Sequence, residues 1–281
     1  MICFYHGADF DGKCSAAVVK YKYPECRLFP VDHGKPFPWH EIKQGEKAFM
    51  VDFSLSIDRM LHLAKKTELI WIDNHTSSIK DAIEAGFNPA GIRVLGKSGC
   101  ELTWEYLFKG ELTPTVVHLL GRFDVHDLTD TRTLPFQYGF NLEDVDPNNV
   151  ELWSRLFEGD VKFVDHVISN GVPILAYKTY TDSDTIKRHA FDAEFDGLKA
   201  LVVNTGVKGS GTFDSRWDPE KYDIMLTFVI TPAGVSGSMY TTKENLDLSK
   251  VARKFGGGGR PQASGYSFNN IDKFFKVLSY K

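Results

Sequence analysis

The segment that most constrains this chain is a short acidic turn near its beginning, residues 6–12, which reads HGADFDG. It follows the β-branched and aromatic run 2–5 and precedes the run 13–19, which has the composition of the first turns of a helix. In an open α/β sheet, ligands bind at this end of the strands. Asp9 and Asp11 can point to one place from such a turn, and a divalent cation would remove the repulsion between their carboxylates. The turn therefore predicts a metal site.

Composition restricts the class of protein. The chain has 281 residues, of which 42% are hydrophobic and 25% charged, and this indicates a folded globular protein of one large or two ordinary domains. The net charge is −4, so a nucleic-acid partner would have to meet a local basic patch. The four cysteines are scattered without a CxxC pair, which fits a reducing cytosol. No signal peptide and no apolar run near the ~20 residues of a membrane span is found, so we expect a cytoplasmic protein without membrane contact.

The first half alternates strand and helix patterns. Strand candidates after the first are residues 27–31, 48–52, 69–73 and 92–95, and helix candidates are 57–64, 98–108 and 115–120. This order predicts a parallel sheet with helices on both faces.

The pattern changes near residue 148. A helix over 150–169, a break at 171–173 and an amphipathic helix over 174–191 are followed by strands at 198–204, 224–231 and 235–241. We therefore expect an α/β domain over 1–172, a linker helix over 173–194 and a smaller α/β domain over 195–281.

Acidic and histidine residues recur where the predicted strands end. Asp52 ends the run 48–52, Asp73 and His75 end the run 69–73, and Asp124 lies in the segment 121–127. Parallel strands place such ends side by side. Oxygen and nitrogen ligands without a thiolate suit Mn²⁺ or Mg²⁺ better than zinc, and the set suffices for two ions ~3.5–4 Å apart. A single aspartate of this kind ordinarily caps the next helix, but the recurrence favours a metal site.

A glycine run at 256–259, followed by Arg260, is the second strong signal. Successive glycines leave backbone amides uncovered, and such amides can line an anion site. Arg260 adds a guanidinium suited to phosphate. A flexible linker is the alternative, although the helical segment before the run and the small residues 263–265 after it argue against that. The Gly- and Ser-rich segment 206–219 is expected to be a mobile loop, with Phe213 and Trp217 as candidates for a substrate lid.

Together these motifs resemble the DHH phosphoesterases with a C-terminal DHHA1 domain, a family that includes RecJ exonuclease, nanoRNases, cyclic-dinucleotide phosphodiesterases and exopolyphosphatase-related proteins. The family pattern is a His, Asp-x-Asp-Gly, a strand-end Asp, Asp-His-His, a further Asp and a GGGH-like run ending in Ala-Ser-Gly. Its parts occur here in this order, from His6 to Gly265. The resemblance implies an N-terminal parallel-sheet DHH domain and a smaller α/β DHHA1 domain.

The resemblance also implies roles for individual residues. Asp9 and Asp11 would bind one metal each, Asp52 would bridge the two ions, and His75 and Asp124 would complete the two sites. His6 would be a further ligand and Asp73 a carboxylate that orients its neighbours. Catalytic roles would fall on Asp73, Asn74 and His75, and substrate binding on Gly257, Gly258, Gly259, Arg260 and Ser264.

Two residues depart from the family pattern. Asn74 stands where Asp-His-His has its first histidine; its amide can coordinate a metal or donate to a phosphate, but it cannot act as an acid. Arg260 stands where the GGGH run has histidine, and it keeps a permanent cation there.

The expected activity is that of a two-metal phosphodiesterase which hydrolyses short single-stranded oligonucleotides or linear dinucleotides to mononucleotides, with two Mn²⁺ ions and Mg²⁺ as the alternative ion. Hydrolysis of polyphosphate or pyrophosphate would use the same site. Asn74 motivates a third hypothesis, a nucleotide-binding module without catalysis. Members of the family are often dimeric, so a homodimer is compatible with the resemblance.

Overall fold

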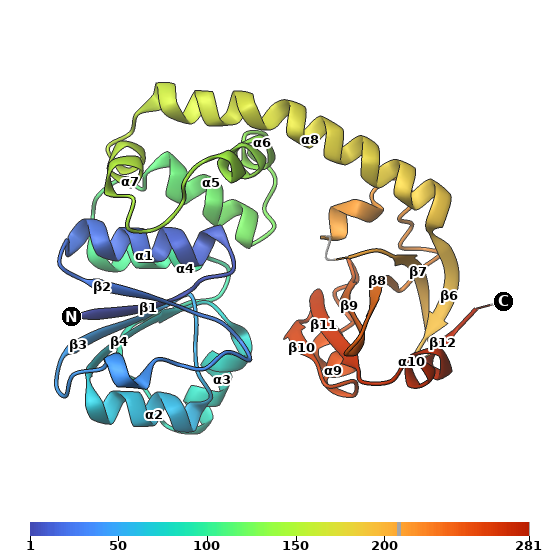
Figure 1. Cartoon of the computed structure of the whole chain (residues 1–281), viewed down its shortest axis with the longest axis horizontal. Coiled ribbons are helices and arrows are strands. Elements are labelled where there is room, and N and C mark those ends of the chain that lie inside the picture. Colours follow the sequence, from blue (N-terminus) through green and yellow to red (C-terminus); the bar gives the residue numbers. More distant parts are fainter. Residues whose placement is uncertain (207–208, 281) are drawn as a thin grey trace. The chain divides into compact units, whose positions relative to one another are not determined.

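The computed structural model describes residues 1–206 and 209–280. They form two compact units, Met1–Leu175 and Ala176–Lys281 (Figure 1). The boundary between the units falls inside the longest helix, α8 (Val161–His189). In the part of the chain that the structure describes, no helix has the length and apolar character needed to cross a membrane.

The N-terminal unit is built on a five-stranded parallel sheet in the order β2-β1-β3-β4-β5. Strands β3 and β4 are buried over almost their whole length, as expected for parallel strands that are covered on both faces. The predicted parallel α/β architecture is therefore confirmed. The strands are β1 (Ile2–His6), β2 (Arg27–Val31), β3 (Lys47–Val51), β4 (Glu68–Asp73) and β5 (Ala90–Arg93).

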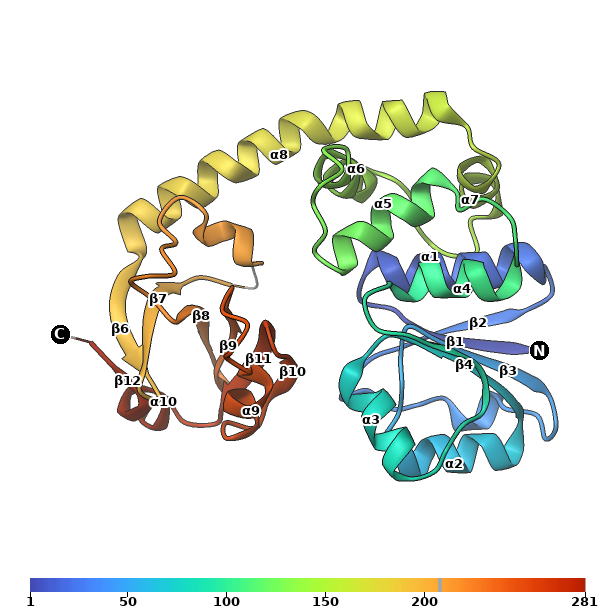
Figure 2. The ribbon, with the colours of Figure 1, turned by 180° about the vertical axis from the view of Figure 1, so that it is seen from behind.

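Helices cover both faces of this sheet (Figures 1 and 2). α1 (Phe10–Lys22) and α4 (Gly99–Leu107) lie on one face, and α2 (Ile57–Lys66) and α3 (Thr76–Glu84) lie on the other. A further helical layer packs on α1 and α4 through an aromatic core that includes Phe136, Phe140 and Trp153. This layer consists of α5 (Thr115–Asp124), α6 (Thr133–Gly139), α7 (Val150–Phe157) and the first part of α8; short 3₁₀ turns lie at η1 (Trp39–Glu41) and η2 (Phe140–Leu142).

The expected helix break at 171–173 is wrong, because α8 continues through it with Pro173 inside. A Cβ atom on Gly171 would lie 1.7 Å from the carbonyl oxygen of Pro135, and one on Gly139 would lie 1.9 Å from that of Val167. The two glycines thus let the backbones of α6 and α8 touch. The helix expected over 150–169 is instead divided at Gly159, whose φ of 82° ends α7.

The C-terminal unit is built on a seven-stranded sheet in the order β10-β11-β9-β8-β7-β6-β12. β7 and β8 pair in parallel and the other neighbours are antiparallel. Its core is aromatic and centres on Phe195, Phe228 and Phe274. The elements are β6 (Phe191–Phe195), β7 (Leu198–Asn204), η3 (Ser210–Phe213), β8 (Ile224–Thr231), β9 (Gly234–Tyr240), α9 (Leu248–Arg253), β10 (Gly258–Arg260), β11 (Ala263–Phe268), α10 (Ile271–Val277) and β12 (Leu278–Ser279).

The segment 206–219 does not present Phe213 as a lid. Phe213 is fully buried in a small core with Ile186 and Leu201, and the neighbouring hydroxyl of Thr212 donates to Asp182 at 3.3 Å. A side chain committed to a core cannot close over a substrate, so the lid expectation is wrong for Phe213. Residues 207 and 208 of this segment lie outside the described residues.

Candidate metal centre

Two groups of side chains that could hold a metal ion share Asp52. His6, Asp9 and Asp52 form the first group, and Asp52, Asp73 and His75 form the second. Within each group, one ligand atom from every residue lies within 4.8 Å of the others. The residues come from the ends of β1, β3 and β4, which are neighbours in the sheet. Parallel strand ends therefore meet as the sequence predicts.

Asp52 occupies a constrained position between the two groups. It is 2% exposed, its φ is 52°, and its amide donates to the carbonyl of Ile72 at 3.0 Å. Aspartate is one of the few residues that enter this left-handed region readily. A Cβ atom on Gly99 would lie 2.4 Å from that of Asp52, so the start of α4 approaches Asp52 as closely as only glycine permits.

In the first group, the side chains of His6 and Asp9 contact each other. Nδ1 of His6 lies 2.8 Å from Oδ2 of Asp9, and Oδ1 of Asp9 accepts the amide of Gly12 at 2.9 Å. Asp9 thus also caps α1, so the capping role and the metal role are compatible in one side chain. Burial lowers the pKa of His6, but the hydrogen bond and charge of Asp9 outweigh it, so the pKa is raised overall.

Asp73 orients His75 in the second group. The carboxylate of Asp73 is fully buried; its Oδ1 contacts Nδ1 of His75 at 2.6 Å and accepts the amide of Asn74 at 2.8 Å, and its Oδ2 accepts the indole N–H of Trp71 at 3.2 Å. Through this contact the carboxylate orients the imidazole ring of His75.

Asp11 is held by the start of α4. Its two carboxylate oxygens accept the amides of Gly99 and Cys100, both at 2.8 Å. Burial, followed by the charges of Asp124 and Asp9, raises the pKa of Asp11 to about 7. Among the residues that the structure describes, Asp11 and Asp124 belong to neither ligand group.

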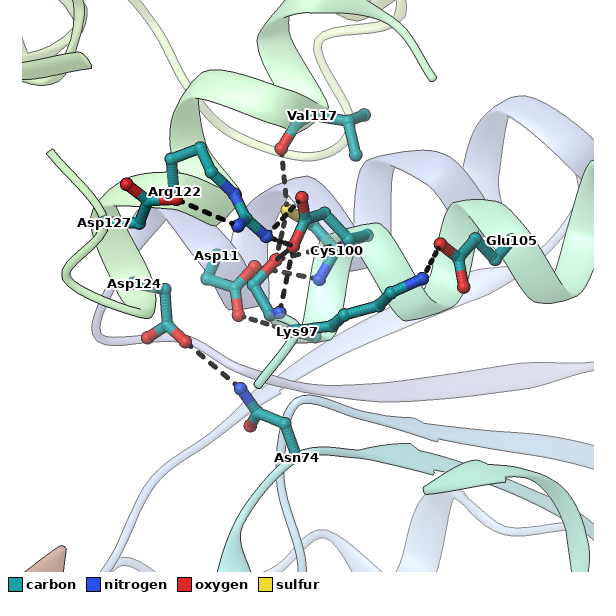
Figure 3. Close-up of polar contacts among 12 residues, drawn as sticks. Asp11, Asn74, Lys97, Cys100, Glu105, Val117, Arg122, Asp124 and Asp127 are labelled. Carbon is teal, nitrogen blue, oxygen red and sulfur yellow. Dashed lines mark hydrogen bonds and ion pairs between the residues drawn. The ribbon is translucent and has the colours of Figure 1, made fainter. Parts of the chain in front are cut away.

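Asn74 and Asp124 point toward one another in Figure 3, one from the end of β4 and the other from the end of α5. Nδ2 of Asn74 donates to Oδ2 of Asp124 at 3.1 Å. Oδ1 of Asn74 is buried and, within the described chain, accepts no hydrogen bond. A buried amide oxygen without a donor costs free energy that a cation would remove.

The donor set fits divalent cations. Burial raises the pKa of Asp52 well above its usual range, and the charges of Asp11, Asp9 and Asp124 add to the shift. Several carboxylates therefore oppose one another in a buried space that also contains the unpaired oxygen of Asn74. A bound cation would neutralise the repulsion and satisfy that oxygen.

A second network joins α4 to α5 (Figure 3). Nη2 of Arg122 donates to both carboxylate oxygens of Glu101, at 2.8 and 2.7 Å, and Nη1 donates to Asp127 at 3.3 Å. Glu101 also completes a capping box with Ser98 at the start of α4. The helix start that holds Asp11 is thereby fastened to the helix end that carries Asp124. Sequence reasoning missed this network.

Sequence reasoning also missed Asp32 and His33, which directly follow β2. Oδ1 of Asp32 lies 3.9 Å from Nε2 of His6, and the His33 ring is centred 4.7 Å from the ring of Phe53. A cavity of about 100 Å³ adjoins them, lined by residues 31–37, 53–56 and Arg59. The available signal was an Asp-His pair at a strand end, the pattern already recognised after β4.

The glycine run forms an edge hairpin. Gly258–Arg260 is strand β10, which pairs with β11 at one end of the sheet. The amide of Gly257 donates to the carbonyl of Ala252 at 3.0 Å, so the expected row of uncovered amides is wrong at this position. Ser264 is 4% exposed, and its hydroxyl donates to the carbonyl of Arg260 at 2.8 Å.

Comparisons with known proteins identify the fold. No protein-family model matches the chain. An uncharacterized protein of Acanthamoeba polyphaga mimivirus is 23% identical in an alignment 299 positions long, which covers 96% of this chain and 68% of the viral protein.

Solved structures of similar fold include a DHH domain and two other proteins, each 12–13% identical to this chain. The DHH domain of a member of the s1p family of ribosomal proteins matches 98% of this chain and 84% of that one, with a TM-score of 0.59 and 13% identity. A pGpG-specific phosphodiesterase from Vibrio cholerae superposes on 98% of this chain and over 95% of its own length, with a TM-score of 0.56 and 12% identity. An exopolyphosphatase-related protein from Bacteroides fragilis superposes on 98% of this chain and over 89% of its own length, with a TM-score of 0.50 and 13% identity. The chain therefore has the fold of the DHH proteins, and the resemblance seen in its motifs is confirmed at the level of the fold.

Proposed function

We propose that this protein is a two-metal phosphodiesterase that hydrolyses short single-stranded oligonucleotides or linear dinucleotides to mononucleotides. The observation that carries the proposal is the buried Asp52, which belongs to two ligand groups at once. A carboxylate shared between two sites is the arrangement that two-metal phosphoryl chemistry requires. The pGpG-specific phosphodiesterase of similar fold makes a linear dinucleotide the first substrate to test.

In this proposal the ions are two Mn²⁺, with Mg²⁺ as the alternative. Their ligands would be His6, Asp9, Asp11, Asp52, His75 and Asp124, joined by the amide oxygen of Asn74. When bound, the ions would supply Lewis acidity toward the phosphoryl oxygens and lower the pKa of a water. Asp73 would keep Nε2 of His75 directed at the site through its bond to Nδ1.

Other residues of the chain would position a ligand and bind the substrate. Asn74 cannot donate a proton to a leaving group, but its amide holds the carboxylate of Asp124 in place. The hairpin residues Gly257, Gly258, Gly259, Arg260 and Ser264 would bind the substrate, with the Arg260 guanidinium meeting a phosphate. The open position of Gly258, where a Cβ atom would meet nothing within 4 Å, leaves room for this approach.

The test is a single incubation series with Mn²⁺ and 5′-labelled oligoribonucleotides from dimers to long strands, with pyrophosphate in parallel. Rapid conversion of the shortest strands to mononucleotides, abolished by EDTA, is the expected result. Preferential degradation of long strands, or phosphate release from pyrophosphate alone, would contradict the proposed substrate class.

A second candidate is a nucleotide-binding module without catalysis, which is favoured by one observation. Asn74 stands where the family signature has a histidine, and its Nδ2 is engaged by Asp124. Such a module would bind Mn²⁺ and a dinucleotide in equilibrium dialysis and release no mononucleotide. Turnover that disappears in Asp52→Asn would exclude it.

A further inference from the structure

A groove in the C-terminal unit is not used by the proposed chemistry. It has a volume of about 590 Å³, within the about 300–1,000 Å³ typical of ligand sites. Its apolar surface comes from Phe255, Phe268 and Val277, and its cations are Lys254, Lys273 and Lys276; Gly256, Ser267 and Asn269 complete the lining. The groove thus combines an apolar floor with a cationic rim.

The cations of this groove face few acids. Lys273 and Lys276 are exposed and lie one turn apart on α10, which places them on one side of the helix. Neither forms an ion pair with a described residue, whereas Lys254 pairs with Asp196 at 2.6 Å. Between residues 248 and 280 the sequence contains six Lys or Arg residues and one acid, Asp272. A chain of net charge −4 therefore carries a local basic patch here.

Two of the lining side chains are aromatic and also pack in the core of this unit: Phe255 is half-buried and Phe268 is 9% exposed. The rings of Phe255 and Phe268 are centred 5.1 Å apart with planes 30° from parallel. Gly256, with a φ of 70°, turns the chain between α9 and the glycine hairpin at this place. In sites for single-stranded nucleic acid, lysines meet backbone phosphates and aromatic side chains stack on bases; here the exposed part of Phe255 offers the stacking contact.

The groove borders the start of the hairpin proposed to meet the substrate, because Gly256 precedes Gly257, but its lining does not include Arg260 or Ser264. Phe268 lies four residues beyond Ser264 along β11, which at ~3.4 Å per residue is roughly 13 Å. We propose that the groove is a second binding site, which holds single-stranded nucleic acid of more than a few nucleotides. This inference rests on the proposed function only in taking nucleic acid as the ligand, and it concerns binding, not hydrolysis.

The experiment measures binding without hydrolysis. Fluorescence anisotropy of a labelled fifteen-nucleotide oligouridylate is followed in EDTA for the full-length protein, the double variant Lys273→Glu/Lys276→Glu and the control Lys187→Glu/Lys199→Glu. The control makes the same change in net charge at exposed lysines of the same unit, outside the groove. We expect the groove variant to bind about tenfold more weakly than the control, and its log–log salt slope to fall by about 1.4, since each phosphate contact to a single strand contributes about 0.7.

Dinucleotide hydrolysis with Mn²⁺ is the second readout, and it should be equal in all three proteins. Equal binding by the groove and control variants would overturn the inference. So would a parallel loss of dinucleotide hydrolysis in a folded groove variant, because the lysines would then belong to the catalytic site. Absence of hydrolysis in the unmodified protein would reject the proposed function and leave the binding result to be judged separately.

Discussion

Arg122 and Glu101 form a paired contact in which one guanidinium nitrogen donates to both carboxylate oxygens, at 2.8 and 2.7 Å. The side chains are 20% and 11% exposed, so the pair is largely shielded from water. It ties the end of α5 to the start of α4, and these two elements carry Asp124 and the amides that hold Asp11. The pair therefore positions carboxylates that it does not touch.

Arg122→Ala should lower the free energy of unfolding by about 2–3 kcal/mol, because it leaves Glu101 partly buried without its partner. Mn²⁺ affinity should also fall, since Asp124 loses its anchor. Urea denaturation with and without Mn²⁺ measures both effects. The matched control is Arg132→Ala, which removes the exposed ion pair between Arg132 and Asp130. It should change the free energy of unfolding and the Mn²⁺ affinity only slightly. Equal Mn²⁺ affinity in the two variants would contradict the positioning role.

Asp52→Asn should reduce the rate of dinucleotide hydrolysis by more than about 100-fold. Substitution of residues that only orient metal ligands typically reduces activity by about 10- to 100-fold. The metal-free variant should nevertheless unfold at a higher temperature than the unmodified protein at pH 8, because folding no longer has to bury or protonate a carboxyl group whose pKa is raised by burial and by neighbouring acids. Asparagine tolerates the positive φ, so the backbone need not change. Thermal unfolding in EDTA checks this expectation against Asp58→Asn, an exposed control; a lower midpoint in Asp52→Asn would refute it.

The stabilisation by Mn²⁺ should grow as the pH rises. Burial and neighbouring acids raise the pKa of Asp11 to about 7 and that of Asp52 well above its usual range. The native state therefore holds protons that the unfolded state releases, so without metal the stability falls as the pH rises from about 4 to about 7. Metal competes with these protons, and the gain in melting temperature on adding Mn²⁺ should be larger at pH 8 than at pH 5. Equal gains would mean that these carboxylates do not bind the ion.

Asn74→Ala should weaken Mn²⁺ binding by about tenfold, because it removes both the buried amide oxygen and the donor that holds Asp124. Titration with the electron paramagnetic resonance signal of free Mn²⁺ gives the affinity. The control is Asn141→Ala, an exposed position in η2. If the two variants bind Mn²⁺ equally well, the amide takes no part in the site.

The sequence predicts the elements whose signal is local. β7 and β8 have the predicted bounds, 198–204 and 224–231, and each contains a continuous buried run, 200–203 in β7 and 224–228 in β8. β5 is displaced from the predicted 92–95 to Ala90–Arg93, because Val94 and Leu95 are exposed beyond the edge of the sheet. Gly171 was misjudged because its partner, the carbonyl of Pro135, lies in another helix. A glycine that permits close packing and a glycine that ends a helix have the same local sequence signal.

The candidate site shows the same difference between residues with a local sequence signal and residues whose partners lie far away in the sequence. The acids at the ends of β1, β3 and β4 could be anticipated because parallel strands align their ends. The partners of Asp11 could not, because Gly99 and Cys100 are ordinary residues that become donors only when α4 docks. The Glu101–Arg122 pair is likewise invisible in a pattern of charges along the chain.

The hydrogen bonds from α4 to Asp11 have a consequence for the order of events during synthesis. The donors lie 88 and 89 residues after the acceptor. A ribosome would therefore release β1 to β4, with most of the acids of the cluster, well before the segment that clamps the first of them. In a nascent chain that ends after β4, Asp11 would lack the hydrogen bonds from Gly99 and Cys100, and the carboxylates would repel one another. The cluster of acids is therefore complete only once the chain has been made as far as α5, which carries Asp124.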